Sequence, residues 1–422
     1  MAEARPPSDA ERPDVVVVGG GPAGALVALL VARAGASVVV LERAPAYRWR
    51  AGGVFASPAA MASLRRAGVP EPVLGRAARP IAAMRVEAPG GAVVALTYGT
   101  ERGGPPAVGF DRSALDPALL DLAARAGAEI RLGTGVETID LGAVRPGIVA
   151  EPGIGRPRIV ARRGDELVRL EPGIVVGADG QRSTLADAAG VARRPRLAGR
   201  VGLTYHVREP APGATRDARM IVLPGAYCGI APVPDGRLNI GIVLTGRAWR
   251  DRLRATGARA TVRAILTALP RRDGEDERWR AAEPVDAIEG AVPLGSRVAR
   301  RSGPGWLLVG DAAGFLDPFT GEGLHRAFRS AELGAAAVAA ALGGDRLALD
   351  RYDRSMRARF ATKDLVSLVV QAFLGRPGAF DYAARRLAAR RRERELLGLV
   401  LGDLVPASRA LDPRFLARVL AP

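Results

Sequence analysis

The feature that most constrains this chain is a glycine-rich turn at residues 19–24, which directly follows four consecutive valines. The valines predict a buried strand, and the turn has the G-x-G-x-x-G spacing of a dinucleotide-binding unit. In such a unit the first glycine permits a tight turn, the second lets the backbone approach a pyrophosphate, and the third lets the next helix pack on the strand. These positions are Gly19, Gly21 and Gly24. The sequence therefore predicts a strand–turn–helix unit that binds a dinucleotide.

The segments that follow complete this unit. Residues 25–34 predict a helix and residues 37–41 a second strand, which ends in Glu42. The start of the helix supplies free amide groups and partial positive charge for phosphates. A carboxylate only accepts hydrogen bonds, so Glu42 is expected to bind ribose hydroxyls. The alternative is an ordinary glycine-rich turn in an α/β fold, and the complete order of strand, turn, helix, strand and acid argues against it.

The composition limits the class of protein. A chain of 422 residues suits two domains and a tail. The net charge of +17 suggests nucleic-acid binding, yet only Lys363 is a lysine among the 61 basic residues. Arginine enriched together with alanine, glycine and proline indicates a bias of the whole genome, and no nucleic-acid-binding module is visible. We expect no nucleic-acid partner.

Few side chains are available for metal or disulfide chemistry. The single Cys228 excludes an internal disulfide, and two histidines, His206 and His325, leave little for a metal centre, so no metal is expected. Residues 1–13 are charged and proline-rich, which predicts a disordered lead rather than a signal peptide. No segment reaches the roughly 18–20 uncharged residues of a membrane span. We expect a cytoplasmic protein.

Two later motifs belong with the first. Asp179 and Gly180 follow a predicted strand at residues 174–176, and Gly310 and Asp311 follow another at residues 306–309. Ligands of open α/β sheets lie at the carboxyl ends of the strands. The second motif continues through Gly321 and Gly323 into a helix, whose first amides are expected to face a second electron-rich group.

Together the three motifs resemble flavoproteins with a para-hydroxybenzoate-hydroxylase-like fold, over residues 14–345. The run from residue 310 to residue 323 is most similar to the geranylgeranyl reductase branch. The resemblance implies an α/β fold: a Rossmann-like FAD-binding domain with a parallel sheet, a smaller domain built on an antiparallel sheet, and a helical C-terminal tail. The expected boundaries are 14–80, 108–200 and 285–345 for the FAD-binding domain, 81–107 and 201–284 for the substrate domain, and 346–422 for the tail.

The resemblance also assigns residues to FAD. It implies that Glu42 holds the adenosine ribose, Val136 meets the adenine, and Asp311 binds the ribityl–pyrophosphate region. Arg112 is expected to reach the flavin, and the backbone at Leu324 to face the isoalloxazine ring. The full set is Gly19, Gly21, Ala23, Gly24, Glu42, Arg43, Ala51, Gly52, Arg112, Val136, Asp179, Gly180, Gly310, Asp311, Gly321, Gly323 and Leu324.

The chain departs from the branch in two places. Ala51 stands where a cysteine is common, so a thiol role is absent, and Gly229 stands where a tryptophan is common, which removes a large wall from the expected pocket. Related halogenases need a pocket lysine, and Lys363 lies outside the matching region, so halogenation is not expected.

FAD supports two chemistries here. A reduced flavin passes a hydride to an activated double bond, or activates O₂ to hydroxylate an electron-rich ring. The latter suits a chain with so few histidines, so we expect an NAD(P)H-dependent monooxygenase acting on a lipophilic aromatic or polyketide-like molecule. The alternatives are a flavin-dependent reductase of prenyl or other C=C bonds, and a non-catalytic FAD-binding redox protein. Residues 133–135 lack the third glycine of a second fingerprint, so NAD(P)H is expected to bind transiently in the cleft, unless a protein supplies the electrons.

Candidate substrate-pocket residues are Tyr227, Pro232, Pro318 and His325. Tyr227 and Cys228 alternate along a predicted strand, so one of them faces the pocket, and we favour Tyr227. For His325, capping or packing at the helix start is favoured over contact with the substrate. The arginine-rich C-terminal region could contact an anionic membrane, although a helical layer that covers the substrate domain is the favoured interpretation. The oligomeric state is left open.

Overall fold

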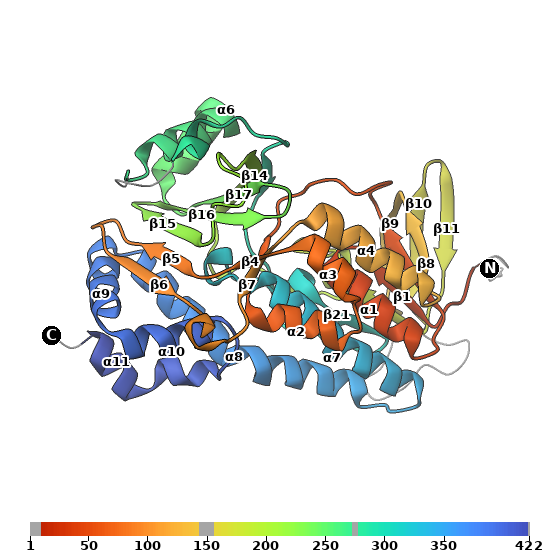
Figure 1. Cartoon of the computed structure of the whole chain (residues 1–422). Coiled ribbons are helices and arrows are strands. Elements are labelled where there is room, and N and C mark those ends of the chain that lie inside the picture. The colour runs from red at the N-terminus through yellow and green to blue at the C-terminus, as the bar shows by residue number, and fades with distance from the viewer. Residues whose placement is uncertain (1–9, 143–155, 272–276, 421–422) are drawn as a thin grey trace.

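The computed structural model of the chain describes residues 10–142, 156–271 and 277–420. Its centre is a six-stranded sheet (Figure 1). In spatial order the strands are β20 (Ser302–Gly303), β21 (Trp306–Leu308), β12 (Ile174–Gly177), β1 (Val15–Val18), β2 (Val38–Glu42) and β8 (Glu129–Leu132). All pairs are parallel except the edge strand β20. The valines of β1 are buried because this strand lies inside the sheet with elements packed over it.

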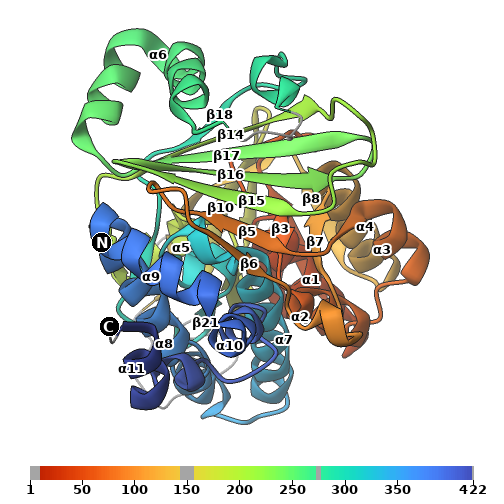
Figure 2. The ribbon, with the colours of Figure 1, turned by 60° about the vertical axis from the view of Figure 1, so that its left-hand side comes forward.

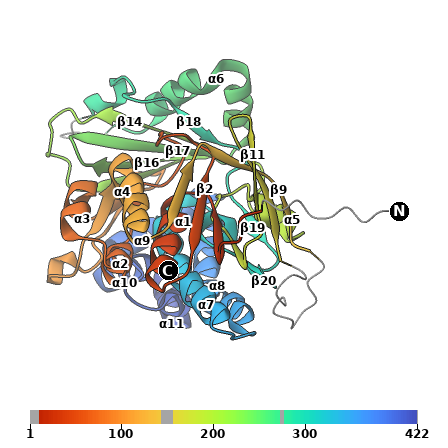
Figure 3. The same cartoon turned by 90° about the vertical axis from the view of Figure 1, so that its right-hand side faces the viewer.

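Helices and a small sheet complete this half of the molecule. α1 (Pro22–Arg33) lies between α4 (Arg112–Arg125) and α7 (Gly323–Leu342). A three-stranded sheet packs into the same core (Figure 3). Its strands are β9 (Thr134–Asp140), β10 (Arg158–Arg163) and β11 (Glu166–Leu170), and the short helices nearby are α2 (Pro58–Arg66), α3 (Glu71–Ala77) and α5 (Thr184–Ala188). The parallel sheet expected from the first motif is confirmed.

A seven-stranded sheet forms the second half, and α6 (Arg247–Ala268) covers its outer face (Figure 2). In spatial order the strands are β18 (Glu289–Ala291), β14 (Val201–Arg208), β17 (Arg237–Leu244), β16 (Ala226–Val233), β15 (Ala218–Leu223), β5 (Met84–Glu87) and β6 (Val93–Leu96). The expectation of a wholly antiparallel sheet is wrong at one pair, because β5 runs parallel to β15. The hairpin of β5 and β6 comes from much earlier in the chain and is added to the edge of the sheet.

Two smaller sheets and the C-terminal helices complete the molecule. The strands β3 (Phe55–Ala56), β7 (Ala107–Phe110) and β4 (Ala78–Ile81) form one of them, and β13 (Ala192–Arg193) pairs with β19 (Arg297–Val298) in the other. The C-terminal helices are α8 (Ala348–Leu374), α9 (Pro377–Ala389), α10 (Arg391–Leu401) and α11 (Pro413–Leu420). α8 packs on α7, while α9 and α10 pack on β6. Among the described residues, none of the helices has the length and apolar character needed to cross a bilayer.

Several boundaries differ from the expected ones. Glu11 hydrogen-bonds to the strand at Arg169 and pairs with Arg131, so the end of the predicted disordered lead is ordered; its residues 1–9 lie outside the described part. β18 falls in the segment expected to belong to the FAD-binding domain, yet it pairs with β14. The sequence of residues 249–269 predicts one long helix, yet α6 is interrupted at Gly257, where φ is 78°. The sequence of residues 134–176 predicts several short strands, and residues 143–155 of this segment lie outside the described part.

Candidate functional site

A cavity of about 750 Å³ connects the two large sheets. One end lies at the carboxyl ends of β1 and β2, and the other lies against the inner face of the seven-stranded sheet. Between these ends the wall is formed by the loop of residues 46–55, the start of α4 and the segment of residues 310–324. The three sequence motifs therefore meet at one place, although they are far apart in the chain.

The glycine turn has the geometry that its spacing predicts. Gly19 has a φ of 103°, and a Cβ there would lie 2.6 Å from the carbonyl oxygen of Ala178. A Cβ on Gly24 would lie 1.9 Å from the carbonyl oxygen of Gly19, so this glycine lets α1 pack against the turn. Gly21 faces open space. The strand-to-helix connection can therefore approach a ligand with its bare backbone.

The groups around the turn fit a dinucleotide such as FAD. No side chain caps the start of α1, whose N-cap is Gly21 and whose first residue is Pro22. Facing it, Asp179 Oδ1 is buried without a hydrogen-bond partner in the described part of the chain, although its other oxygen accepts from the amide of Thr184 at 2.7 Å. Free helix-start amides match a diphosphate, and a buried unpaired oxygen requires a donor.

Glu42 is fixed before any ligand contacts it. Its Oε2 accepts from the amide of Gly20 at 2.9 Å, and its Oε1 accepts from the amide of Ala44 at 2.9 Å. Arg50 donates to the same Oε1 at 3.2 Å. Val136 lines this end of the cavity beside the carboxylate. The arrangement fits an adenosine held by its ribose and adenine.

Arg112 occupies the middle of the cavity wall. Its guanidinium makes a bidentate ion pair with Asp116, with both N–O distances 2.7 Å, and donates to the carbonyl oxygen of Gly53 at 3.0 Å. A Cβ on Gly52 would lie 3.1 Å from Arg112 Nη1. Arg112 therefore holds the loop of residues 46–55 against α4, and a residue larger than glycine at position 52 would disturb it.

Two half-buried carboxyl groups, those of Asp311 and Asp179, line the cavity. Burial raises the pKa of Asp311, and hydrogen bonding from Gln181 Nε2 at 3.3 Å opposes that change. Burial likewise raises the pKa of Asp179. Gln181 also accepts from the amide of Gly295 at 2.8 Å. Gln181 was not among the predicted site residues, although its place directly after Asp179 and Gly180 was the signal that could have identified it.

Every residue assigned to FAD by resemblance lines the cavity, except Gly24, which lies behind the turn. The roles of these residues in binding stay predictions. Across the described residues, no three His, Cys, Asp or Glu side chains come together in a way that could hold a metal ion.

The substrate candidates divide into two pairs. Tyr227 and Pro318 line the cavity, while Cys228 packs toward α6. The Tyr227 hydroxyl donates to Asp317 Oδ1 at 2.6 Å, and burial raises its pKa well above the usual value.

Pro232 and His325 do not line the cavity, so the expectation is wrong for Pro232, while for His325 the structure shows the packing that was favoured over substrate contact. The Pro232 peptide packs on Gly109, because strand alternation turns it away from the cavity. His325 points into the packing of α7 with the C-terminal region, where its Nε2 lies 4.0 Å from Asp403 Oδ2. Burial lowers the pKa of this histidine.

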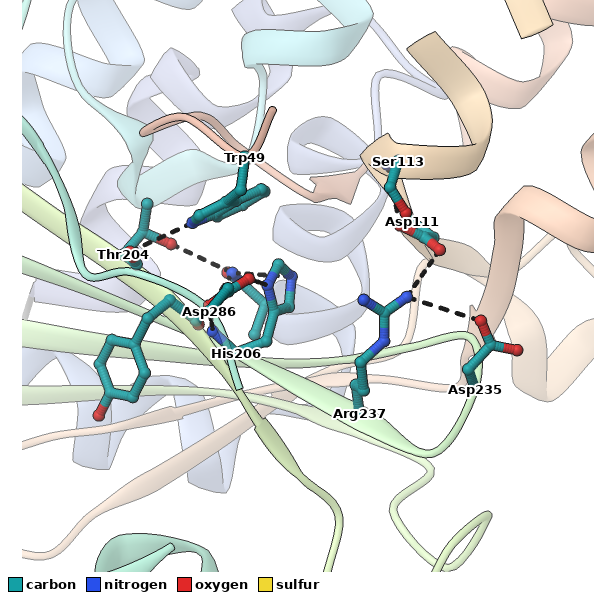
Figure 4. Close-up of polar contacts among 10 residues, drawn as sticks. Trp49, Asp111, Ser113, Thr204, His206, Asp235, Arg237 and Asp286 are labelled. Carbon is teal, nitrogen blue, oxygen red and sulfur yellow. Dashed lines mark hydrogen bonds and ion pairs between the residues drawn. The ribbon is translucent and has the colours of Figure 1, made fainter. Parts of the chain in front are cut away.

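A polar cluster at the sheet end of the cavity was not predicted from the sequence (Figure 4). Trp49 lies edge-on to His206 with ring centroids 4.4 Å apart, and donates to the carbonyl oxygen of Thr204 at 3.4 Å. His206 Nδ1 lies 2.6 Å from Asp286 Oδ2. Asn239 joins the cluster from the neighbouring strand. Two paired strands, the loop of residues 46–55 and the segment before β18 bring these residues together, so no local pattern indicates them.

The sequence matches the FAD binding domain family over residues 12–365. The chain is 31% identical to the menaquinone reductase of Mycolicibacterium smegmatis over 332 residues, which cover 77% of this chain and 76% of the relative. It is 30% identical to digeranylgeranylglycerophospholipid reductase 2 of Methanothermobacter thermautotrophicus over 359 residues, which cover 82% of this chain and 83% of the relative.

Solved structures share the fold at lower identity. A flavoprotein/dehydrogenase from Cytophaga hutchinsonii has a TM-score of 0.78 at 20% identity, covering 97% of this chain and 95% of that one. A geranylgeranyl bacteriochlorophyll reductase-like protein from Thermoplasma acidophilum has a TM-score of 0.71 at 21% identity, covering 98% and 96%. With the family match spanning most of the sequence, the chain belongs to the FAD binding domain family and is an FAD-dependent oxidoreductase of its geranylgeranyl reductase-like branch.

Proposed function

We infer that this oxidoreductase reduces a carbon–carbon double bond in an isoprenoid-bearing lipid or quinone, with NAD(P)H as the electron donor. The relatives at 30% identity or above that cover most of the chain are named as reductases of menaquinone or of a geranylgeranyl lipid. The observation that carries the proposal is the single cavity that extends from the FAD-binding residues to an apolar sheet face.

The apolar part of the cavity suits a hydrocarbon chain. Its wall contains Met84, Met220, Leu203 and Val243 from four strands, and Leu294 beside them. Burying such a chain is favourable by about 0.8 kcal/mol for each methylene group removed from water. No His, Cys or Lys side chain is among the described residues that line this cavity. Apolar contact with these side chains would hold the hydrocarbon chain of the substrate.

When bound, FAD supplies the hydride transfer in this chemistry. The chain fixes the reaction geometry: Glu42 and the start of α1 hold the nucleotide end, and Arg112 holds the loop that closes the cavity. The apolar wall excludes water from the reacting bond. Tyr227, held by Asp317, also lines the cavity.

Hydroxylation of a lipophilic aromatic or polyketide-like molecule, the first expectation from the sequence, is the second candidate. The observation in its favour is Gly229, which leaves the sheet face open for a ring wider than an isoprenoid chain. Both candidates need reduced FAD, and they differ in their need for oxygen.

One experiment separates the candidates. The purified holoenzyme is incubated with NADPH or NADH and menaquinone or a geranylgeranyl lipid, with and without O₂, and the products are analysed by mass spectrometry. The proposal expects anaerobic gain of one hydrogen molecule per double bond. A product that gains one oxygen atom only when O₂ is consumed would replace the proposal with hydroxylation, and a flavin that neither nucleotide reduces would exclude NAD(P)H as the donor.

A further inference from the structure

On the inner face of the seven-stranded sheet, two adjacent positions at the centre of the cavity carry no side chain. Gly229 of β16 and Gly241 of β17 are direct cross-strand partners, and both line the cavity. A Cβ on Gly241 would meet nothing within 4 Å, and one on Gly229 would meet only the mobile end of Met220 and, at 3.7 Å, the Gly241 carbonyl oxygen. We call this pair the glycine floor. It exposes flat peptide groups to the cavity where neighbouring positions carry side chains.

The glycine floor has a polar end and an apolar end. In the same cross-strand row, Thr204 is the partner of Gly241 on one side, and Met220 is the partner of Gly229 on the other. On the neighbouring strand β5 the wall includes Met84, the cross-strand partner of Ala218. A molecule that lies along this row therefore meets oxygen-containing groups at one end and thioethers and hydrocarbon at the other.

A buried amide at the polar end has an oxygen available to a ligand. Asn239 is 6% exposed and lines the cavity. Its Nδ2 lies 3.2 Å from the carbonyl oxygen of Tyr205 and 3.1 Å from Thr204 Oγ1. A carbonyl oxygen only accepts hydrogen bonds, so the amide atom that faces the Tyr205 carbonyl oxygen is the nitrogen Nδ2 and not the oxygen Oδ1. Within the described part of the chain, Asn239 Oδ1 has no hydrogen-bond partner.

The cluster beneath fixes this orientation. The Asp286 carboxylate accepts from His206 Nδ1, so the proton lies on that nitrogen and Nε2 is an acceptor. Asn239 Nδ2 lies 3.3 Å from this Nε2 (Figure 4 labels the histidine and its carboxylate). Turning the amide over would place its oxygen against two acceptors. Asp286 and His206 therefore keep Asn239 Oδ1 directed away from the sheet backbone.

We propose that the glycine floor seats a flat, oxygen-bearing ring at one end of the substrate, with Asn239 and Thr204 as positioning residues for the ring oxygen. Asn239 Oδ1 accepts from a hydroxyl, and Thr204 Oγ1, which accepts from Asn239, has its own proton to donate to a carbonyl. The apolar chain of the substrate extends from the ring along Met220 and Met84. This inference deepens the proposed function and rests on it for the identity of that chain.

Binding of two probes to the oxidised holoenzyme tests whether the glycine floor holds the ring of the substrate. Menadione is a flat dione ring without an isoprenoid chain, and geranylgeraniol is a chain without a ring; each is titrated while the visible absorption of the flavin is recorded. Gly241→Val adds a side chain to the glycine floor at a position where a Cβ would meet no protein atom within 4 Å. We expect it to raise the dissociation constant of menadione at least about tenfold and that of geranylgeraniol less than about twofold. Gly75→Ala, at an exposed position with equally open space, is expected to change neither.

The positioning residues have their own variants. Thr204→Val is expected to weaken menadione binding about fivefold, as for one lost hydrogen bond, and Thr204→Ser to restore it. FAD content and melting temperature report folding, and Gly241→Ala replaces Gly241→Val if the valine variant loses FAD. The proposal that the glycine floor holds the ring would be overturned by either of two results. One is that the Gly241 variant weakens the binding of both probes equally, and the other is that the unaltered protein does not bind menadione.

The outcomes keep the two proposals apart. If menadione binding depends on Gly241 while no isoprenoid double bond is reduced, the seat stands and the proposed function is wrong. If a chain is reduced while the Gly241 variant binds menadione as the unaltered protein does, the function stands and the seat is wrong.

Discussion

Glu42 illustrates, at the scale of single residues, how a binding group is prepared by its own backbone. Two amides and Arg50 hold the carboxylate at the end of β2. We expect Glu42→Gln, which keeps the size and removes the charge, to raise the dissociation constant of FAD about tenfold, since a charge-assisted hydrogen bond contributes about 1.5–3 kcal/mol. Flavin fluorescence during titration of apoprotein measures this.

A matched control for this prediction is Glu71→Gln, because Glu71 is exposed and pairs with Arg65 outside the cavity. Equal FAD affinity of the Glu42 variant and the Glu71 variant would contradict the ribose assignment.

His325 makes a second prediction at this scale. Burial lowers its pKa, and neither ring nitrogen has a hydrogen-bond partner within the described residues. As the pH falls below about 6.5, the unfolded chain takes up a proton here that the folded chain resists, so stability is full above that pH and declines below it. For one histidine the decline is at most about 1.4 kcal/mol per pH unit.

Denaturant unfolding at about pH 7.5 and about pH 5.5 measures this decline. We expect His325→Gln to lose less stability between these pH values than the unaltered protein does. Identical losses in both proteins would show that His325 is protonated equally in the folded and unfolded chains.

At the scale of elements, the packing of α1 on β1 depends on one missing side chain. The Cβ of Gly24→Ala would lie 1.9 Å from a backbone oxygen, which cannot move without displacing the turn. We expect a destabilisation of about 2–4 kcal/mol, a lower melting temperature and loss of FAD. Gly75→Ala in α3 adds the same methyl group in open space and is expected to be tolerated. An unchanged melting temperature for Gly24→Ala would contradict the close packing.

The end of α10 depends on the chain's single lysine. Lys363 is 4% exposed and donates to the carbonyl oxygen of Val400 at 2.6 Å and to Asp403 Oδ1 at 2.9 Å. Lys363→Met leaves a buried carboxylate without its cation, so we expect a loss of about 3–5 kcal/mol and faster amide exchange over residues 391–420. Arg391→Met, which removes an exposed pair with Glu101, is the control. Equal exchange in the two variants would contradict this role of Lys363.

Sequence patterns predicted most helices and strands, but they did not predict every pairing of one strand with another. The valine run, the turn at Gly19 and the alternation around Tyr227 act locally, so they identify strands, helices and facing directions. The parallel pairing of β5 with β15, and the row that joins Thr204 to Met220, arise from segments far apart in the chain. Their register depends on the packing of the whole sheet, which no local period encodes.

At the scale of the whole molecule, the C-terminal helices form a layer against β6 and α7, which is the favoured interpretation of the arginine-rich tail. Membrane contact through this region stays a prediction. Removing residues 346–422 would uncover core, so charge variants test it more cleanly. We expect Arg385→Gln with Arg392→Gln to reduce co-sedimentation with anionic vesicles several-fold. Absence of sedimentation by the unaltered protein would exclude the contact.

The hairpin of β5 and β6 has a consequence for how such enzymes diversify. It joins a sheet whose other strands come from residues 201–291, so the polypeptide crosses repeatedly between the nucleotide-holding half and the sheet-bearing half. Neither half is continuous in the sequence, so no single gene fragment encodes one complete half without strands of the other. New specificities in this lineage are therefore expected to accumulate by point changes such as those at positions 229 and 241, rather than by exchange of modules.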